Sequence, residues 1–285
     1  MRLALAGKAP GDSRPPAFSP IAQELRDEII EHYERRGERL DTAAGRRTLD
    51  TNSTLAARRG RLLLRLLAEQ GAPPVAGRRL LDLGAGFGAL SLYYAHLGAE
   101  VVAVDPNTAR MQVAVAIAAR RGLPVSAVSA HAERLPLSED SVEVVVANNS
   151  LCYIVQPDAQ RLALAEILRV LRAGGWLVAR SPNRLHPRDQ FTGLPLLGLL
   201  PASLAGRTAA ALGRHRSEVH LRSPGGMVRQ LRSAGFTQVR FRAPPGDRRG
   251  FPAGAASRLS GYHHVIARRP SGAATATSGA RASGR

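Results

Sequence analysis

The sequence predicts an α/β fold, in which a doubly wound, mainly parallel sheet follows N-terminal helices and carries a lid insertion. In the middle of the chain, short hydrophobic runs typical of buried strands alternate with longer runs that have a helical period, and the links between them are short. The first hydrophobic run leads straight into a turn with three alternating glycines. At 285 residues, 44% of them hydrophobic, the chain is long enough for one large domain with a sizeable core.

The N-terminal segment, residues 1–75, is expected to contain two helices. Residues 1–20 are rich in proline and glycine and are predicted to be irregular. Over residues 21–36, apolar side chains recur along one helical face, and a second, leucine-rich helix is predicted over residues 54–69. Gly71 ends this helix before two prolines.

The sheet is expected mainly within residues 76–182. Strands are predicted near 79–83, 100–104, 125–128, 142–147 and 175–180, and helices near 87–97, 107–121 and 159–172. Because right-handed crossovers between parallel strands bring ligands to the carboxyl edge of a sheet, we expect the functional site at that edge.

Residues 183–222 interrupt the alternation of strands and helices. A segment of this length at the ligand edge is more typical of a lid than of a structureless loop, and we expect it to bind an acceptor. The core is expected to resume over residues 223–269, with a helix near 223–234 and strands near 237–242 and 262–267. Residues 270–285 are dominated by Ser, Gly, Ala, Thr and Arg, which predicts a disordered tail.

The glycine turn indicates a nucleoside cofactor. Gly84, Gly86 and Gly88 follow the first strand, and glycine allows backbone N–H groups to approach a ligand closely. The second strand ends in Asp105, about where a carboxylate reaches a ribose. The turn alone also satisfies a relaxed dinucleotide pattern. However, Asp82 at the end of the first strand suits a cofactor with an ammonium group, such as S-adenosyl-L-methionine (SAM), better than a pyrophosphate.

Further segments follow the turn in a characteristic order. They are Ala130–Leu137 followed by Ser141–Ala147, then Ala165–Val178, and finally His220–Pro224 leading through Leu231–Phe236. Together with the glycine turn they resemble the class I SAM-dependent methyltransferases, in particular the ubiquinone-biosynthesis-like, small-molecule branch. The resemblance covers residues 78–182 closely and 218–268 less closely, and it implies a Rossmann-like methyltransferase fold with SAM as cofactor.

The resemblance also implies which residues hold SAM. The expected cofactor-binding set is Asp82, Gly84, Ala85, Gly86 and Gly88 toward the methionine part, Asp105 and Pro106 toward the ribose, and His131 and Ala132 toward the adenine. The family usually has an acid where His131 stands, but a histidine nitrogen without a proton can also accept a hydrogen bond from the adenine amino group.

Asn148 and Asn149 follow the fourth strand, so we expect them to face the methionine end of SAM. Alternatively, these two amides cap the next turn.

Two residues are candidates for catalysis. His220 precedes the Ser-Pro start of a helix and could accept a proton from a hydroxyl acceptor, although a helix-entry or surface histidine is an equally good interpretation. Tyr153 either lines the acceptor side or simply packs. No metal site is expected, because methyl transfer from a sulfonium does not require one and the histidines lack the spacing of metal ligands.

Composition limits the compartment. The single cysteine, Cys152, excludes an internal disulfide framework and fits a reducing compartment, so we expect a cytoplasmic protein in which this thiol is packed rather than nucleophilic. We see no signal peptide, and no run approaches the ~20 apolar residues of a transmembrane segment.

The net charge is +18, and residues 182–285 contribute 17 basic against 3 acidic residues. This excess is either a solvated surface or a means of attracting an anionic acceptor, nucleic acid or membrane surface.

The sequence therefore favours a SAM-dependent methyltransferase of small-molecule or secondary metabolism, acting on oxygen of a small acceptor that is anionic or lipid-like. Two alternatives remain open. An RNA methyltransferase would be recruited by the basic C-terminal third, although no aromatic-rich RNA-binding motif is visible. A non-catalytic SAM-binding or scaffold protein would explain the unusual His131. The acceptor's identity, the use of a general base and the oligomeric state cannot be predicted from these patterns.

Overall fold

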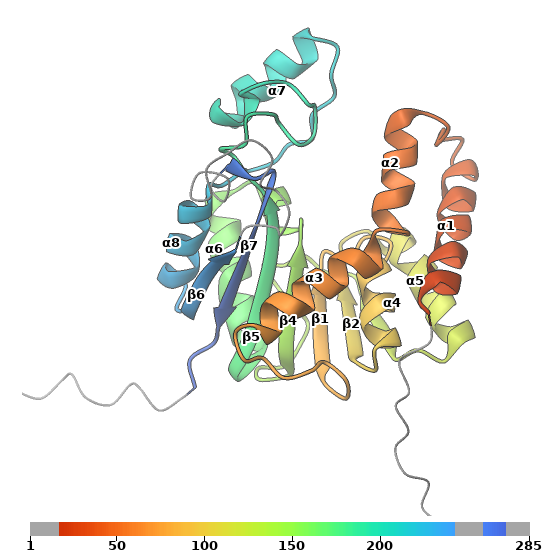
Figure 1. The fold of residues 1–285 in the computed structure, drawn as a ribbon, viewed down its shortest axis with the longest axis vertical. Coiled ribbons are helices and arrows are strands. Elements are labelled where there is room, and N and C mark those ends of the chain that lie inside the picture. Colours follow the sequence, from red (N-terminus) through yellow and green to blue (C-terminus); the bar gives the residue numbers. More distant parts are fainter. Residues whose placement is uncertain (1–16, 243–258, 272–285) are drawn as a thin grey trace, which may run out of the picture.

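The computed structural model describes residues 17–242 and 259–271, and its centre is a seven-stranded sheet with helices on both faces (Figure 1). The strand order is β3-β2-β1-β4-β5-β7-β6. The strands are β1 (Arg79–Leu83), β2 (Glu100–Val104), β3 (Val125–Val128), β4 (Val142–Asn148), β5 (Leu171–Pro182), β6 (Thr237–Arg242) and β7 (Tyr262–Arg268). Only β7 runs antiparallel to its neighbours within the described sheet. The predicted α/β class with a mainly parallel sheet is confirmed.

The helices cover the sheet as doubly wound topology requires. They are α1 (Ser19–Glu34), α2 (Ala43–Asn52), α3 (Ala56–Ala68), α4 (Ala89–His96), α5 (Thr108–Arg121), α6 (Pro157–Val170), α7 (Ala202–Ala211) and α8 (Pro224–Ser233), with short 3₁₀ turns at Leu151–Tyr153 and Leu197–Leu199. Side chains of α3, α4 and α5 pack on one face, and side chains of α6 and α8 pack on the other.

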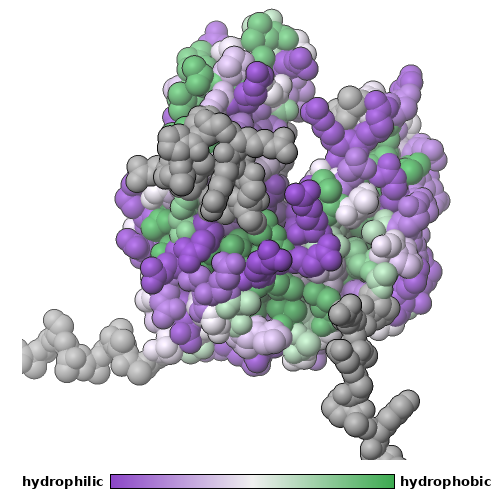
Figure 2. All heavy atoms as spheres, in the orientation of Figure 1, coloured by the Kyte–Doolittle hydropathy of each residue, from purple (hydrophilic) through white to green (hydrophobic). Residues whose placement is uncertain are grey.

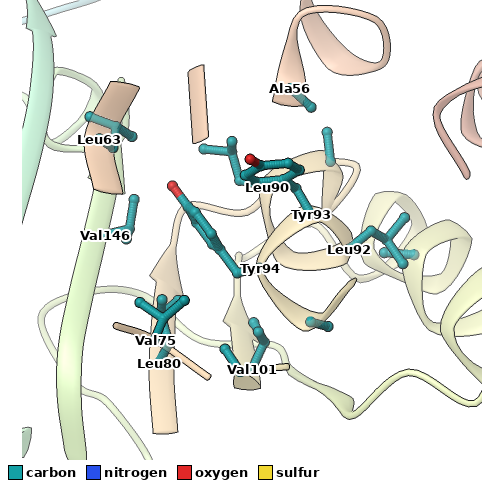
Figure 3. Packing of buried hydrophobic residues seen from close by; sticks show 14 of the residues in the cluster. Ala56, Leu63, Val75, Leu80, Leu90, Leu92, Tyr93, Tyr94, Val101 and Val146 are labelled. Carbon is teal, nitrogen blue, oxygen red and sulfur yellow. The ribbon is translucent and has the colours of Figure 1, made fainter. Parts of the chain in front are cut away.

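Alternation along the strands separates the two halves of the core. In β1, Leu80 joins the cluster under α3 and α4, whereas Leu81 and Leu83 join the cluster under α6. Figure 3 shows the first cluster, in which the ring of Tyr94 lies among Leu63, Leu80 and Val146. Burial of each such side chain contributes about 1.5–3 kcal/mol, so this packing holds the N-terminal helices on the sheet.

Helices α1 and α3 match the two predicted N-terminal helices to within two residues at each end, and α2 is an additional helix. Helix α1 buries Ile21, Leu25 and Ile29 along the predicted face. Helix α2 was not predicted, because its segment has no continuous apolar stripe. The signal for it is the N-cap, where the Thr42 hydroxyl accepts a hydrogen bond from the Gly45 N–H at 3.0 Å.

Strand β5 is longer than predicted, since it spans Leu171–Pro182 instead of residues 175–180, and α6 ends at Val170 rather than near residue 172. The extension begins with a bulge, where Leu171 pairs with Val142 before the regular register with β4 starts at Trp176. Longer pairing brings the end of β5 to the edge where the lid begins.

The lid, residues 183–222, has a small core of its own. Leu197, Ala205 and Ala209 form a buried cluster between the 3₁₀ turn and α7. The carboxylate of Asp189 lies 3.2 Å from the Arg216 guanidinium, and both side chains are almost fully buried. Figure 1 shows α7 above one half of the sheet and α2 above the other half. The predicted tail lies, from residue 272 onward, outside the described residues, as do residues 1–16.

Candidate functional site

A cavity of about 570 Å³ lies at the carboxyl edge of the sheet, within the size range of small-molecule sites. The turn after β1, the ends of β2 and β4, the loop after β3 and the start of α3 contribute its walls. Most of the predicted cofactor-binding residues line it, namely Asp82, Gly84, Ala85, Gly86, Asp105, Pro106, His131, Ala132, Asn148 and Asn149. Their roles toward a cofactor stay predictions, but the fold brings them together.

The three glycines of the turn have different surroundings. A Cβ on Gly84 would lie 2.3 Å from the Ser150 Cβ, and one on Gly88 would lie 2.2 Å from the Ala114 Cβ. A Cβ on Gly86 meets no described atom within 4 Å. All three have positive φ. Gly84 and Gly88 therefore allow close packing, whereas Gly86 keeps one side of the cavity open. Gly88 does not belong to the residues that line the cavity.

Asp105 connects the turn to the end of β2. Its Oδ2 accepts a hydrogen bond from the Gly86 N–H at 2.9 Å, and its Oδ1 accepts one from the Asn107 N–H at 2.8 Å. A carboxylate has about four lone-pair directions, so acceptor capacity remains for the hydroxyls of a ribose. The carboxylate is thus held in place before any ligand arrives.

Asp82 is buried at the floor of the cavity, only 2% exposed. The Ser91 hydroxyl donates a hydrogen bond to its Oδ2 at 2.7 Å. Burial raises the pKa of Asp82 to about 6, and the nearby charge of Asp105 acts in the same direction. At neutral pH this carboxylate is mostly charged but poorly solvated, so a cationic ligand would stabilise it.

Asn149 is strained and incompletely bonded. It adopts a positive φ of 59°, and among the described residues its buried Oδ1 has no hydrogen-bond partner. The next 3₁₀ turn has no side-chain cap, so capping does not account for the amide. A strained residue with an unpaired amide oxygen beside a cavity is typical of a ligand-binding position.

The two candidate catalytic residues lie in different places. Tyr153 lines the cavity and is 52% exposed, and burial of the rest raises the pKa of its phenol above the ordinary value. His220 lies outside the lining residues, beside a much smaller space that Cys152 and Arg222 also line. Its backbone N–H donates to the Cys152 carbonyl at 2.8 Å, and burial, aided by the charge of Arg222, lowers the pKa of its imidazole.

The lid arginines include two that are bonded within the protein. Arg216 pairs with Asp189, and Arg222 donates to the Gln160 side chain.

Cys152 is buried, and its pKa is raised to about 12 by burial, so the thiol stays protonated at neutral pH. The described residues contain no cluster of His, Cys, Asp and Glu that could hold a metal ion. None of the described helices is both long and apolar enough to cross a bilayer.

One wall of the cavity was missed by sequence reasoning. Thr51 and Asn52 at the end of α2, with Ala56 and Arg59 of α3, also line the cavity. These residues belong to no motif, and only the packing of α3 across the sheet brings them to the site. The notch between this wall and the lid has hydrophilic side chains at its floor (Figure 2).

Comparison with known proteins identifies the central part of the chain. Residues 81–179 match the family described as "Methyltransferase domain". A demethylmenaquinone methyltransferase of Clavibacter sepedonicus is 38% identical over 133 residues, which are 45% of this chain and 51% of that enzyme. An uncharacterized methyltransferase of Mycobacterium tuberculosis is 40% identical over 105 residues, which are 36% of this chain and 40% of that protein. The chain thus spans about half, or less, of the length of these curated relatives.

Solved structures show the same fold. The 1,6-didemethyltoxoflavin-N1-methyltransferase of Burkholderia thailandensis, with S-adenosylhomocysteine bound, superposes with a TM-score of 0.52 at 24% identity, covering 92% of this chain and 94% of that one. The CcbJ methyltransferase of Streptomyces caelestis gives a TM-score of 0.55 at 22% identity, covering 76% and 90%. At these identities the likeness concerns the fold.

Proposed function

This chain carries a class I SAM-dependent methyltransferase domain, and we propose that it transfers the methyl group of SAM to an oxygen atom of a small molecule. The observation that supports this most strongly is the cavity itself. It brings together a buried carboxylate, Asp82, an unpaired amide, Asn149, and a preformed carboxylate, Asp105, around a glycine turn that keeps one side open. These groups are complementary to an ammonium, a sulfonium and a ribose, which are three of the polar parts of SAM.

The residues present fit SAM. In the proposal, Asp82 and the turn hold the methionine end, Asp105 holds the ribose, and His131 and Ala132 lie beside the adenine. When bound, SAM supplies an electrophilic methyl group. The protein's task is to align an acceptor with that methyl and to exclude water, because in-line displacement depends mainly on positioning.

Tyr153 is the better placed of the two candidates for handling the acceptor. Its phenol lines the cavity just after the β4 end, where an acceptor would meet the methyl. Because burial raises its pKa, Tyr153 stays protonated at neutral pH and would orient an acceptor oxygen by hydrogen bonding rather than act as a base. His220 lies outside the cavity lining, so a direct role would require the lid to move.

The names of two similar proteins also describe small-molecule acceptors, namely a demethylmenaquinone and a didemethyltoxoflavin. The RNA alternative has less support, because part of the basic excess is used inside the fold. Arg216 is buried against Asp189, and Arg269 pairs with Asp140 and also bonds the Leu171 carbonyl. These arginines are not free for a polyanion.

The test is calorimetry followed by a screen. The full chain is expected to bind SAM and S-adenosylhomocysteine at micromolar concentrations and not to bind NAD. Methyl-labelled SAM, incubated with the chain and pools of hydroxylated metabolites, is expected to label a small product at oxygen. NAD binding without SAM binding would refute the proposal. SAM binding with no labelled product from any pool would favour the non-catalytic alternative.

A further inference from the structure

Two arginines from different elements lie at or beside the cavity, although only Arg59 is among the residues that line it. Arg59 of α3 lines the cavity, and its Nη1 donates a hydrogen bond to the Thr51 carbonyl at 2.7 Å. Arg180 of β5 lies next to Asn148 of β4, and its Nη1 is 3.5 Å from the Asn148 Oδ1. Helix α3 packs against β5, so the two side chains converge although 121 positions separate them in the sequence.

Neither guanidinium has an acidic partner. Within residues 17–242 and 259–271, no carboxylate lies within the ion-pair distance of 4.0 Å of Arg59 or Arg180. The contrast with the lid is informative, because Arg216 there is buried together with Asp189. In the lid, the charge of a buried arginine is thus balanced by a buried carboxylate.

The surroundings of Arg180 hold it without neutralising it. Its guanidinium carbon lies 3.5 Å from the centre of the Tyr262 ring, a cation–π contact that fixes the plane of the group. Burial, together with a smaller effect of the Arg59 charge, lowers the pKa of Arg180 to about 10. Burial also lowers the pKa of Arg59. Both groups remain protonated at neutral pH, so two like charges that repel each other stay poorly solvated.

We infer that Arg59 and Arg180 together bind an anionic oxygen group, such as a carboxylate or phosphate, of the methyl acceptor. Burying two guanidiniums without counter-charge is unfavourable unless a ligand supplies the charge, and a planar guanidinium binds such oxyanions through paired hydrogen bonds. The site adjoins Asn148 at the end of β4, so a bound anion would be anchored next to the donor end of the cavity. This inference rests on the proposed function.

The experiment uses simple anions, because the acceptor is unidentified. The full chain is first saturated with S-adenosylhomocysteine. Benzoate and inorganic phosphate are then titrated, with benzamide as a neutral analogue of benzoate, and binding is followed by calorimetry and by thermal shift. The variants are Arg59→Gln and Arg180→Gln. Arg58→Gln is the matched control, since Arg58 is the exposed neighbour of Arg59 on the same helix.

At least one of the two anions is expected to bind the wild type and the Arg58→Gln variant, and benzamide is not. Arg59→Gln and Arg180→Gln are each expected to weaken binding of that anion at least tenfold. If neither anion binds the wild type, or if Arg58→Gln weakens binding as much as Arg59→Gln, the inference is wrong. Should Arg180→Gln fail to fold, Arg59→Gln alone still decides the matter, and Arg180→Lys, which keeps the charge, gives the second measurement.

Another anion could occupy the same place, namely the carboxylate of SAM itself. The affinity for S-adenosylhomocysteine distinguishes the two sources. It is expected to stay within about twofold of wild type in both variants. A tenfold loss there would assign the arginines to the cofactor and overturn the acceptor site. If S-adenosylhomocysteine does not bind the wild type at all, the proposed function fails instead, whereas cofactor binding without anion binding rejects this inference alone.

Discussion

At the scale of single residues, the buried charge of Asp82 lowers the stability of the ligand-free protein at neutral pH. The carboxyl group is buried, and its folded-state pKa is about 6 against an ordinary value of 3.8. The native state therefore binds more protons than the unfolded state between these values. The contribution of Asp82 to stability is present at low pH and is lost as the pH rises through about 6, a difference on the order of 3 kcal/mol.

Asp82→Asn is therefore expected to raise the melting temperature of the ligand-free protein at pH 7.5 and to change it little at pH 4. The same variant is expected to weaken SAM binding, because the amide offers no charge to an ammonium group. Wild-type affinity for SAM is expected to fall as the pH drops through about 6. Thermal denaturation and calorimetry at both pH values check this. A lower melting temperature for the variant at pH 7.5 would contradict it.

Asp105 differs from Asp82 because it is already hydrogen-bonded to two backbone N–H groups. We expect Asp105→Ala to weaken SAM binding by about 1.5–3 kcal/mol, the scale of a hydrogen bond to a charged acceptor. Calorimetry measures the affinity, and Asp158→Ala, which removes an exposed acid on α6, serves as control. Unchanged affinity in Asp105→Ala would remove this residue from the ribose site.

At the scale of elements, the glycines of the turn have two different roles: Gly88 allows close packing, and Gly86 leaves room for a ligand. Gly86→Val places its side chain in open space, so the fold is expected to persist apart from about 1–2 kcal/mol of strain from the positive φ, while SAM binding is lost. Gly88→Val drives a side chain into Ala114 of α5, so a much larger drop in melting temperature is expected. Circular dichroism and calorimetry on the pair decide whether the two positions differ in this way.

Elements could be predicted where local chemistry decides them. Strands β1, β2 and β4 are mainly apolar runs. Asp82, Asp105 and Asn149 could be placed at the cavity because Asp82 is the last residue but one of β1, and Asp105 and Asn149 directly follow β2 and β4. Helix α2 could not be predicted from apolar periodicity, since its main signal is one capping hydroxyl. The antiparallel pairing of β7 with β5 and β6 is a tertiary arrangement that no local pattern encodes.

The arginine pair shows the limit of sequence reasoning at the site. Arg59 and Arg180 stand on different elements, and their neighbouring residues form no motif. Their meeting depends on how α3 crosses β5, a tertiary contact set by side-chain packing such as that of Leu63 against the sheet. Arg58 precedes Arg59 in the same helix, and only the structure tells which of the two faces the cavity.

At the scale of the whole molecule, both apolar contacts and ion pairs attach α1 to the rest of the fold. Leu25 is fully buried beneath α1, and the adjacent Glu24 forms ion pairs with Arg120 and Arg121 of α5. Leu25→Ala is expected to lower the free energy of unfolding by about 2–5 kcal/mol, because it leaves a cavity. Glu24→Gln is expected to cost about 1 kcal/mol or less, since partly exposed ion pairs are screened by water.

Chemical denaturation of both variants measures these differences. A loss for Glu24→Gln as large as that for Leu25→Ala would show that charge, rather than apolar contact, fastens α1 to the core. Raising the salt concentration provides a second check, because it is expected to narrow the difference between Glu24→Gln and wild type and to leave Leu25→Ala unchanged.

The order of the site residues along the chain has a consequence for how such a protein can diversify. The residues proposed to hold SAM all fall between Asp82 and Asn149, inside the segment that matches the methyltransferase family. The part of the cavity wall that α2 and α3 form, with Arg59, precedes that segment, and Arg180 and the lid follow it. If the flanking segments bind the acceptor as proposed, replacing them by those of a relative is expected to change the acceptor while the methyl source stays the same.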